Sequence, residues 1–156
     1  MSDRLWDWAL LAWKTPGVED AALELQDVGG QNICLLLWAA WAARIGAPLD
    51  DETLEAACDA ARAWERRVTG PLRGVRRALK GSLIDIEAAD REAVRDAVKA
   101  VEIDAERRLL LALEALTPAE RGESRPAMDG LVAASRAWDR VTPRAGLTAF
   151  AERLPA

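Results

Sequence analysis

The chain has 156 residues, of which 51% are hydrophobic and 30% are charged, and its formal net charge at pH 7 is −5. This length suits one domain, and the scarcity of aromatic strand formers, with no Tyr and one Phe, argues against a β-rich fold. The absence of His excludes imidazole-based catalytic triads and removes the commonest general base and transition-metal ligand.

The N-terminal residues predict two short helices. The first runs to about residue 14, with Ser2 or Asp3 as its cap. Asp7 interrupts its apolar run and no small-residue cleavage site follows, so we expect no signal peptide and a cytoplasmic protein. A Pro-Gly step at 16–17 opens a second helix over residues 17–27. The predicted core face of the first helix consists of Leu5, Trp6, Ala9, Leu10 and Trp13.

Residues 31–43 carry no charge and predict a third helix that is apolar on both faces. A membrane-spanning helix needs about 20 apolar residues, and this run stops at Arg44 and Gly46. A helix that is hydrophobic all round belongs inside a core, so we expect it to be the buried central helix. Cys34 and Cys58 lie in helical patterns without metal-site spacing, and we expect buried, reduced thiols.

The middle of the chain predicts a long antiparallel helical hairpin. Apolar residues recur at helical steps over residues 50–80, across a Gly70-Pro71 step that predicts a kink. A second long helix follows and ends near Leu116, which gives a hairpin about 40 Å long. The fold class is therefore all-α, a helical bundle over residues 1–116. Residues 117–130 are polar and predict a linker, and residues 131–156 predict a short helical tail docked on the bundle.

Several sequence signals occur together in a characteristic order. They include Leu5-Trp6-Asp7-Trp8, Pro16-Gly17-Val18 and Pro71-Leu72-Arg73 followed by Arg76-Arg77 and Leu79-Lys80. Over residues 5–116 the chain resembles an uncharacterised family of small, all-helical proteobacterial proteins, a domain of unknown function. The resemblance implies a bacterial, cytosolic helical domain, and it carries over no activity, cofactor or catalytic residue.

Charge is segregated along the chain. Residues 1–61 have a net charge of −8, residues 62–80 of +6 and residues 81–116 of −4. The helical spacing of the basic segment predicts a stripe along one face. This basic stripe consists of Arg62, Arg66, Arg73, Arg77 and Lys80. It indicates an anion-binding surface, or else a solvated face paired with neighbouring acidic helices.

An acidic protein partner suits the basic stripe better than nucleic acid does. Specific nucleic-acid binding is disfavoured by the net acidity and by the lack of stacking aromatics in the stripe. Opposed charge patches between proteins speed association and fix register. Trp8 lies off the predicted core face of the first helix, so it either forms an exposed edge that adds to the partner surface or packs under the C-terminal tail. A homodimer is compatible with such an edge.

We therefore predict a non-enzymatic interaction or adaptor protein with no cofactor and no transmembrane segment. The alternative is a Mg²⁺-dependent, all-helical hydrolase of a phosphorylated small molecule, because facing carboxylates on two helices can hold this oxygen-loving ion without His. Its candidate ligands are Asp20, Glu24, Asp27, Glu52 and Glu55. A second alternative is a helical protein that binds an apolar ligand between its helices.

Overall fold

The computed structural model describes residues 4–156, and every element in that range is helical, which confirms the all-α fold class. The predicted caps Ser2 and Asp3 lie outside the described residues. The N-terminal elements are α1 (Leu5–Lys14), α2 (Val18–Asp27) and α3 (Ile33–Arg44). The hairpin comprises α4 (Asp51–Trp64), a π-helical turn η1 (Glu65–Thr69), α5 (Gly70–Ala78) and α6 (Ala88–Leu116). The chain ends with α7 (Ala127–Trp138) and α8 (Arg144–Arg153).

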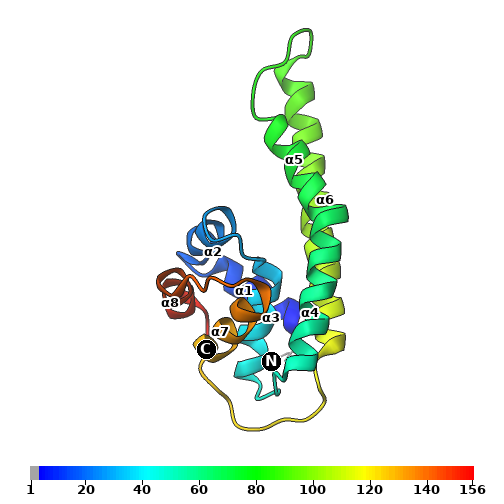
Figure 1. The fold of residues 1–156 in the computed structure, drawn as a ribbon. Coiled ribbons are helices and arrows are strands. Elements are labelled where there is room, and N and C mark those ends of the chain that lie inside the picture. The colour runs from blue at the N-terminus through cyan, green and yellow to red at the C-terminus, as the bar shows by residue number, and fades with distance from the viewer. Residues whose placement is uncertain (1–3) are drawn as a thin grey trace.

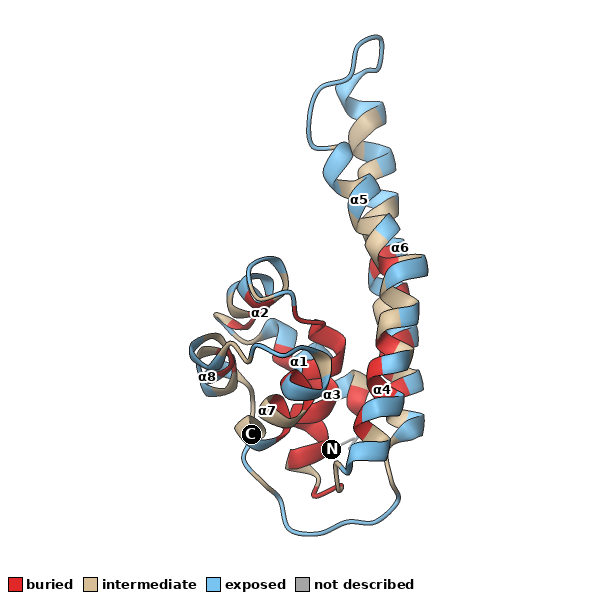
Figure 2. Cartoon of the chain, viewed as in Figure 1, coloured by how far each residue is buried: buried red, intermediate tan, exposed pale blue. Residues whose placement is uncertain are grey.

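The molecule has a helical body from which the hairpin projects (Figure 1). The body gathers α1, α2, α3, α7 and α8 beside the lower half of the hairpin, whereas α5 and the facing part of α6 extend beyond it. Buried residues accordingly concentrate in the body and the lower hairpin (Figure 2). None of the described helices is both long and apolar enough to cross a membrane.

Helix α3 is the centre of the core, as its two apolar faces predict. Every residue from Ile33 to Ala43 is buried. Asn32 caps the helix, because its side-chain oxygen accepts a hydrogen bond from the Leu35 N–H at 3.0 Å. At the other end Gly46 has a φ of +75°, and a Cβ there would collide with the carbonyl oxygen of Gly122. Glycine is therefore required where the polar segment 117–126 passes under α3.

Helix α7 packs closely across α3. Leu131 and Ala134 are fully buried there. The close approach depends on Gly130, because a Cβ at that position would overlap the Ala39 carbonyl. Further along, Leu147 and Phe150 of α8 are also fully buried. Residues 127–156 therefore contribute to the same hydrophobic core as α3.

The predicted core face of α1 is correct for Leu5 and Ala9 and wrong for Leu10 and Trp13. The buried residues are Leu5, Trp8, Ala9 and Ala12, whereas Leu10 and Trp13 are 39% and 40% exposed. Helix α1 contacts α2, α3 and α6, and the small Ala9 and Ala12 let its neighbours approach closely. The helix carries two candidate apolar stripes that share Leu5 and Ala9, and the stripe that contains Trp8 and Ala12 lies against the core.

The kink predicted at Gly70-Pro71 takes the form of a π-helical turn. Pro71 has no N–H, and its ring collides with a carbonyl four residues back in a regular α-helix. The wider turn η1 accommodates it, and the Gly70 N–H donates to the Glu65 carbonyl, five residues back. The two limbs of the hairpin are joined across this region by the Trp64 indole, whose Nε1 donates to the Ala105 carbonyl at 2.8 Å.

Candidate functional site

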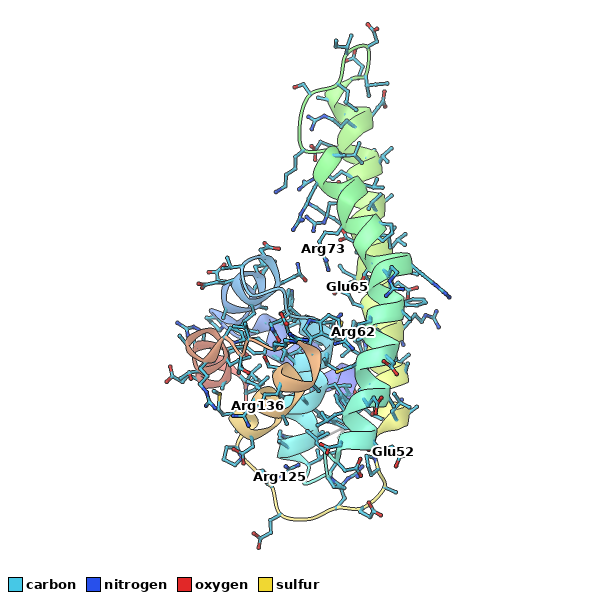
Figure 3. All side chains as sticks on the ribbon, viewed as in Figure 1. Glu52, Arg62, Glu65, Arg73, Arg125 and Arg136 are labelled. Atoms are coloured by element: carbon cyan, nitrogen blue, oxygen red, sulfur yellow. The ribbon has the colours of Figure 1, made fainter. Side chains whose placement is uncertain are left out.

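A cleft of about 590 Å³ lies where the hairpin leaves the body. Gln26, Gly30 and Gln31 line it from the end of α2 and the following loop. From the hairpin come Arg62, Glu65, Arg66 and Arg73. The π-helical turn and its flanks thus form one wall, with Gly70 and Pro71 beside the arginines. In Figure 3, Arg62, Glu65 and Arg73 lie on the side of the hairpin that faces the body.

The structure brings three members of the predicted basic stripe, Arg62, Arg66 and Arg73, into this cleft. Arg73 reaches the body, where its Nη2 donates to Gln26 Oε1 at 3.2 Å. Arg77 lies one turn further on and pairs with Asp27 at 2.9 Å, although both side chains are about half exposed. The stripe is therefore turned toward α2, and part of it is paired internally.

Arg62 is held by the C-terminal part of the chain. Its guanidinium donates to the backbone carbonyl of Trp138 and lies 4.8 Å from the centroid of that indole ring. The same indole donates from Nε1 to the Gly30 carbonyl at 2.9 Å. Trp138 therefore fixes both walls at one end of the cleft.

A cluster of charged and thiol groups surrounds α6 at the same level. Arg76 Nε donates to Glu102 Oε2 at 2.7 Å, and both side chains are largely buried. Burial raises the pKa of Glu106, and nearby Glu102 raises it further, against the opposing effects of Arg73 and Arg76. The Cys34 thiol contacts the Glu106 carbonyl at 4.0 Å.

Cys34 is a poor nucleophile in this setting. Burial raises its pKa well above 9.0, and the charge of Glu106 adds to that effect. A thiol reacts as its thiolate, which these surroundings disfavour. Cys58 is also buried, and its pKa is raised by the same cause. Both cysteines are therefore buried free thiols, as the sequence predicted.

Two expectations about site residues are wrong. Trp8 is only 5% exposed, because the side of α1 that carries it is the buried one, so it offers no surface to a partner. The carboxylates proposed as Mg²⁺ ligands do not converge. Glu52 lies at the start of α4, at the end of the hairpin limb away from the projecting tip, and α2 lies elsewhere in the body (Figure 3). No group of three or more Cys, Asp or Glu side chains within residues 4–156 is placed to hold a metal ion.

Sequence reasoning missed the amide side chains that complete the cleft. Gln26 and Gln31 carry no charge and give no signal of a binding site, and they approach the arginines only in the folded chain. One signal was present for Gln31, since it is a polar residue at the start of the charge-free run, and in the structure it is 2% exposed. Its burial marks it as a residue whose hydrogen bonds matter.

The family model described as protein of unknown function, DUF2390, matches residues 4–113. The match covers more than two thirds of the chain, which therefore belongs to this family. No curated protein and no solved structure matches the chain significantly. The matched range contains α1 to α5 and most of α6, whereas α7 and α8 lie beyond it.

Proposed function

We propose that this chain is a non-enzymatic interaction protein whose projecting hairpin binds an acidic patch on another protein. The observation that carries the proposal concerns residues 70–101, which comprise α5, the connecting turn and the first half of α6, and which we call the arm. No residue of the arm is buried. The arm contains none of the buried core residues, and many of its side chains are exposed to solvent and accessible to a partner.

The tip of the arm exposes branched aliphatic side chains. Ile84 is 91% exposed, Ile86 is 51% exposed and Leu83 is 46% exposed. Asp85 lies between the two isoleucines with a φ of +65°, a left-handed conformation that Asp tolerates better than most residues. The tip is thus a defined turn that presents apolar groups, and apolar groups gathered on a surface mark interaction sites.

The charge of the α5 side suits an acidic partner. Residues 66–80 include six basic residues and no acidic residue. Of these, the side chains of Arg66, Arg67 and Lys80 have no ion-pair or hydrogen-bond partner in the described part of the chain. An interface that combines an apolar centre with complementary charge gives both affinity and fast association.

The remaining alternatives have less support. The apolar-ligand hypothesis does not suit the cleft, whose lining consists mostly of guanidinium, carboxylate and amide groups. The metal-dependent hydrolase lacks converging carboxylates among residues 4–156. An interaction role needs neither a catalytic group nor a metal ion.

The test is site-specific photo-crosslinking in a lysate of the source organism. A photoreactive residue is placed at Ile84 on the arm or, as a control, at Val141, which is 73% exposed and lies off the arm. We expect one protein to crosslink from position 84 and not from position 141. A Lys80→Glu change on the same bait should weaken that crosslink, and increasing salt should weaken it too.

The variants separate binding from folding. Lys80 and Ile84 are exposed, so Lys80→Glu should leave the melting temperature nearly unchanged. If position 84 crosslinks to no protein, or to the same proteins as position 141, the result contradicts an interaction role for the arm. A crosslink whose yield is unchanged by Lys80→Glu and by salt contradicts the proposal that the partner presents an acidic patch.

A further inference from the structure

The lining of the cleft at the base of the arm has an excess of positive charge. The Arg66 side chain has no ion-pair or hydrogen-bond partner within residues 4–156. Arg62 contacts only backbone carbonyls and an indole ring, and Arg73 donates to the neutral amide of Gln26. Against these three guanidinium groups the lining includes one carboxylate, that of Glu65.

The same cleft contains a buried hydrogen-bond acceptor without a partner. Gln31 lines the cleft and is 2% exposed. Its Nε2 donates to the Gly29 carbonyl at 3.3 Å. Its Oε1 accepts no hydrogen bond from the described residues. A buried acceptor left unpaired is costly, so an arrangement of this kind points to a donor that the chain itself does not supply.

We propose that the cleft binds a small organic phosphate, a phosphomonoester that also carries a hydroxyl group. The phosphate lies between Arg66 and Arg73, whose planar guanidinium groups match phosphate oxygens in pairs. The hydroxyl donates to Gln31 Oε1, which a small rotation of the amide brings toward the ligand. This site shares Arg66 with the basic surface proposed for the acidic partner, but it takes a different ligand.

Charge and size both favour this ligand class. Three guanidinium groups and one carboxylate leave a formal charge of +2 in the lining, and a phosphomonoester has a charge of about −1.5 to −2 at pH 7. A monocarboxylate would leave the cleft positively charged. The volume of about 590 Å³ lies within the usual range for small-molecule sites, roughly 300–1,000 Å³.

The test is calorimetric titration of the full chain at low salt with ribose 5-phosphate, chosen because it combines a phosphomonoester with several hydroxyls. Inorganic phosphate, succinate and ribose serve as comparison probes. We expect 1:1 binding of ribose 5-phosphate, with weaker binding of inorganic phosphate and none of ribose. Arg66→Gln should weaken the binding about tenfold or more, because it removes a charge-assisted contact to the phosphate.

Two further variants make the result specific. Arg67→Gln is the matched control, because Arg67 belongs to the same π-helical turn, is exposed and does not line the cleft. It should leave the affinity unchanged. Gln31→Met keeps the length of the side chain and removes the acceptor. It should therefore weaken the binding of ribose 5-phosphate about tenfold and leave the binding of inorganic phosphate unchanged. Thermal unfolding without ligand shows whether each variant is folded. If Gln31→Met does not fold, Arg66→Gln still tests the proposal, because Arg66 is exposed.

Several outcomes would overturn the proposal. One is that ribose 5-phosphate binds the wild type, Arg66→Gln and Arg67→Gln with equal affinity. That result would indicate a general ionic effect. Another is succinate binding as tightly as ribose 5-phosphate, which makes the ligand a dicarboxylate. A third is the absence of any ribose 5-phosphate binding to the folded wild type at millimolar concentration.

Discussion

Arg76 and Glu102 join the two limbs of the hairpin through a hydrogen bond of 2.7 Å between Arg76 Nε and Glu102 Oε2. Their side chains are 22% and 11% exposed, so the pair is shielded from solvent much better than the other ion pairs of the arm. The pair lies near the base of the arm, since Arg76 belongs to α5 and Glu102, the residue that follows the arm in α6, is itself buried.

Removing the guanidinium of this pair should destabilise the fold. Arg76→Met leaves Glu102 buried without its charged partner, and we expect a loss of about 2 kcal/mol in the free energy of unfolding. The matched control is Arg108→Met, which breaks an exposed pair with Asp104 at 3.6 Å and should cost less than about 0.5 kcal/mol. Urea unfolding measures both, and similar losses for the two variants would contradict the structural importance of Arg76.

Two glycines in helices should respond to alanine in opposite directions. At Gly130 a new Cβ overlaps the Ala39 carbonyl where α7 crosses α3, so Gly130→Ala should cost about 2 kcal/mol. At Gly74 in α5 a new Cβ meets nothing within 4 Å, so Gly74→Ala should stabilise by up to about 1 kcal/mol through helix propensity. Thermal unfolding of both variants is the measurement. A Gly130→Ala protein as stable as the wild type would show that α7 lies further from α3.

The raised pKa of Glu106 makes a prediction about pH. Its pKa in the folded chain exceeds the ordinary value of 4.5, so above pH 4.5 the unfolded chain releases this proton first. The contribution of Glu106 to stability therefore decreases as pH rises from 4.5 to the raised pKa, and is constant beyond it. Relative to the wild type, Glu106→Gln should gain stability over that interval. Melting temperatures measured across pH test this, and a constant difference between the two proteins would count against a raised pKa.

The two cysteines should resist modification in the folded chain. Cys34 is 8% exposed and Cys58 is 2% exposed, and burial raises the pKa of both thiols. A thiol reagent at neutral pH should label them slowly, at rates limited by opening of the structure, and both rapidly in denaturant. Single Cys→Ala variants assign the rates. Rapid labelling of Cys34 in the folded chain would contradict its burial against α6.

The architecture could be predicted from the sequence where one signal dominated. A charge-free helix with two apolar faces has nowhere to lie except inside, so the position of α3 followed directly. Helix α1 has two apolar stripes, and which of them is buried depends on packing against three neighbouring helices. The periodicity of the sequence holds no information about that packing. Pro71 predicted an interruption of the helix, whereas the π-helical form of that interruption depends on contacts with α6.

The arginines of the cleft could be predicted from the sequence, whereas the other residues that form it could not. Its arginines stood out because they lie close together in the sequence and share one sign. Gln31, Arg62 and Trp138 are far apart in the sequence and meet through hydrogen bonds at Gly30 and Trp138. Neutral amides and a single indole carry no local signal of such an encounter.

The π-helical turn also has an evolutionary consequence. Each of its hydrogen bonds spans five residues instead of four, so the limb α4–α5 contains one residue more than a continuous α-helix with the same faces. Such a turn is what a single-residue insertion into a helix produces. An alignment of the family should therefore show a one-residue gap within 65–69 in those members that lack a proline at position 71, and in them the arginines on either side of the gap should keep their faces.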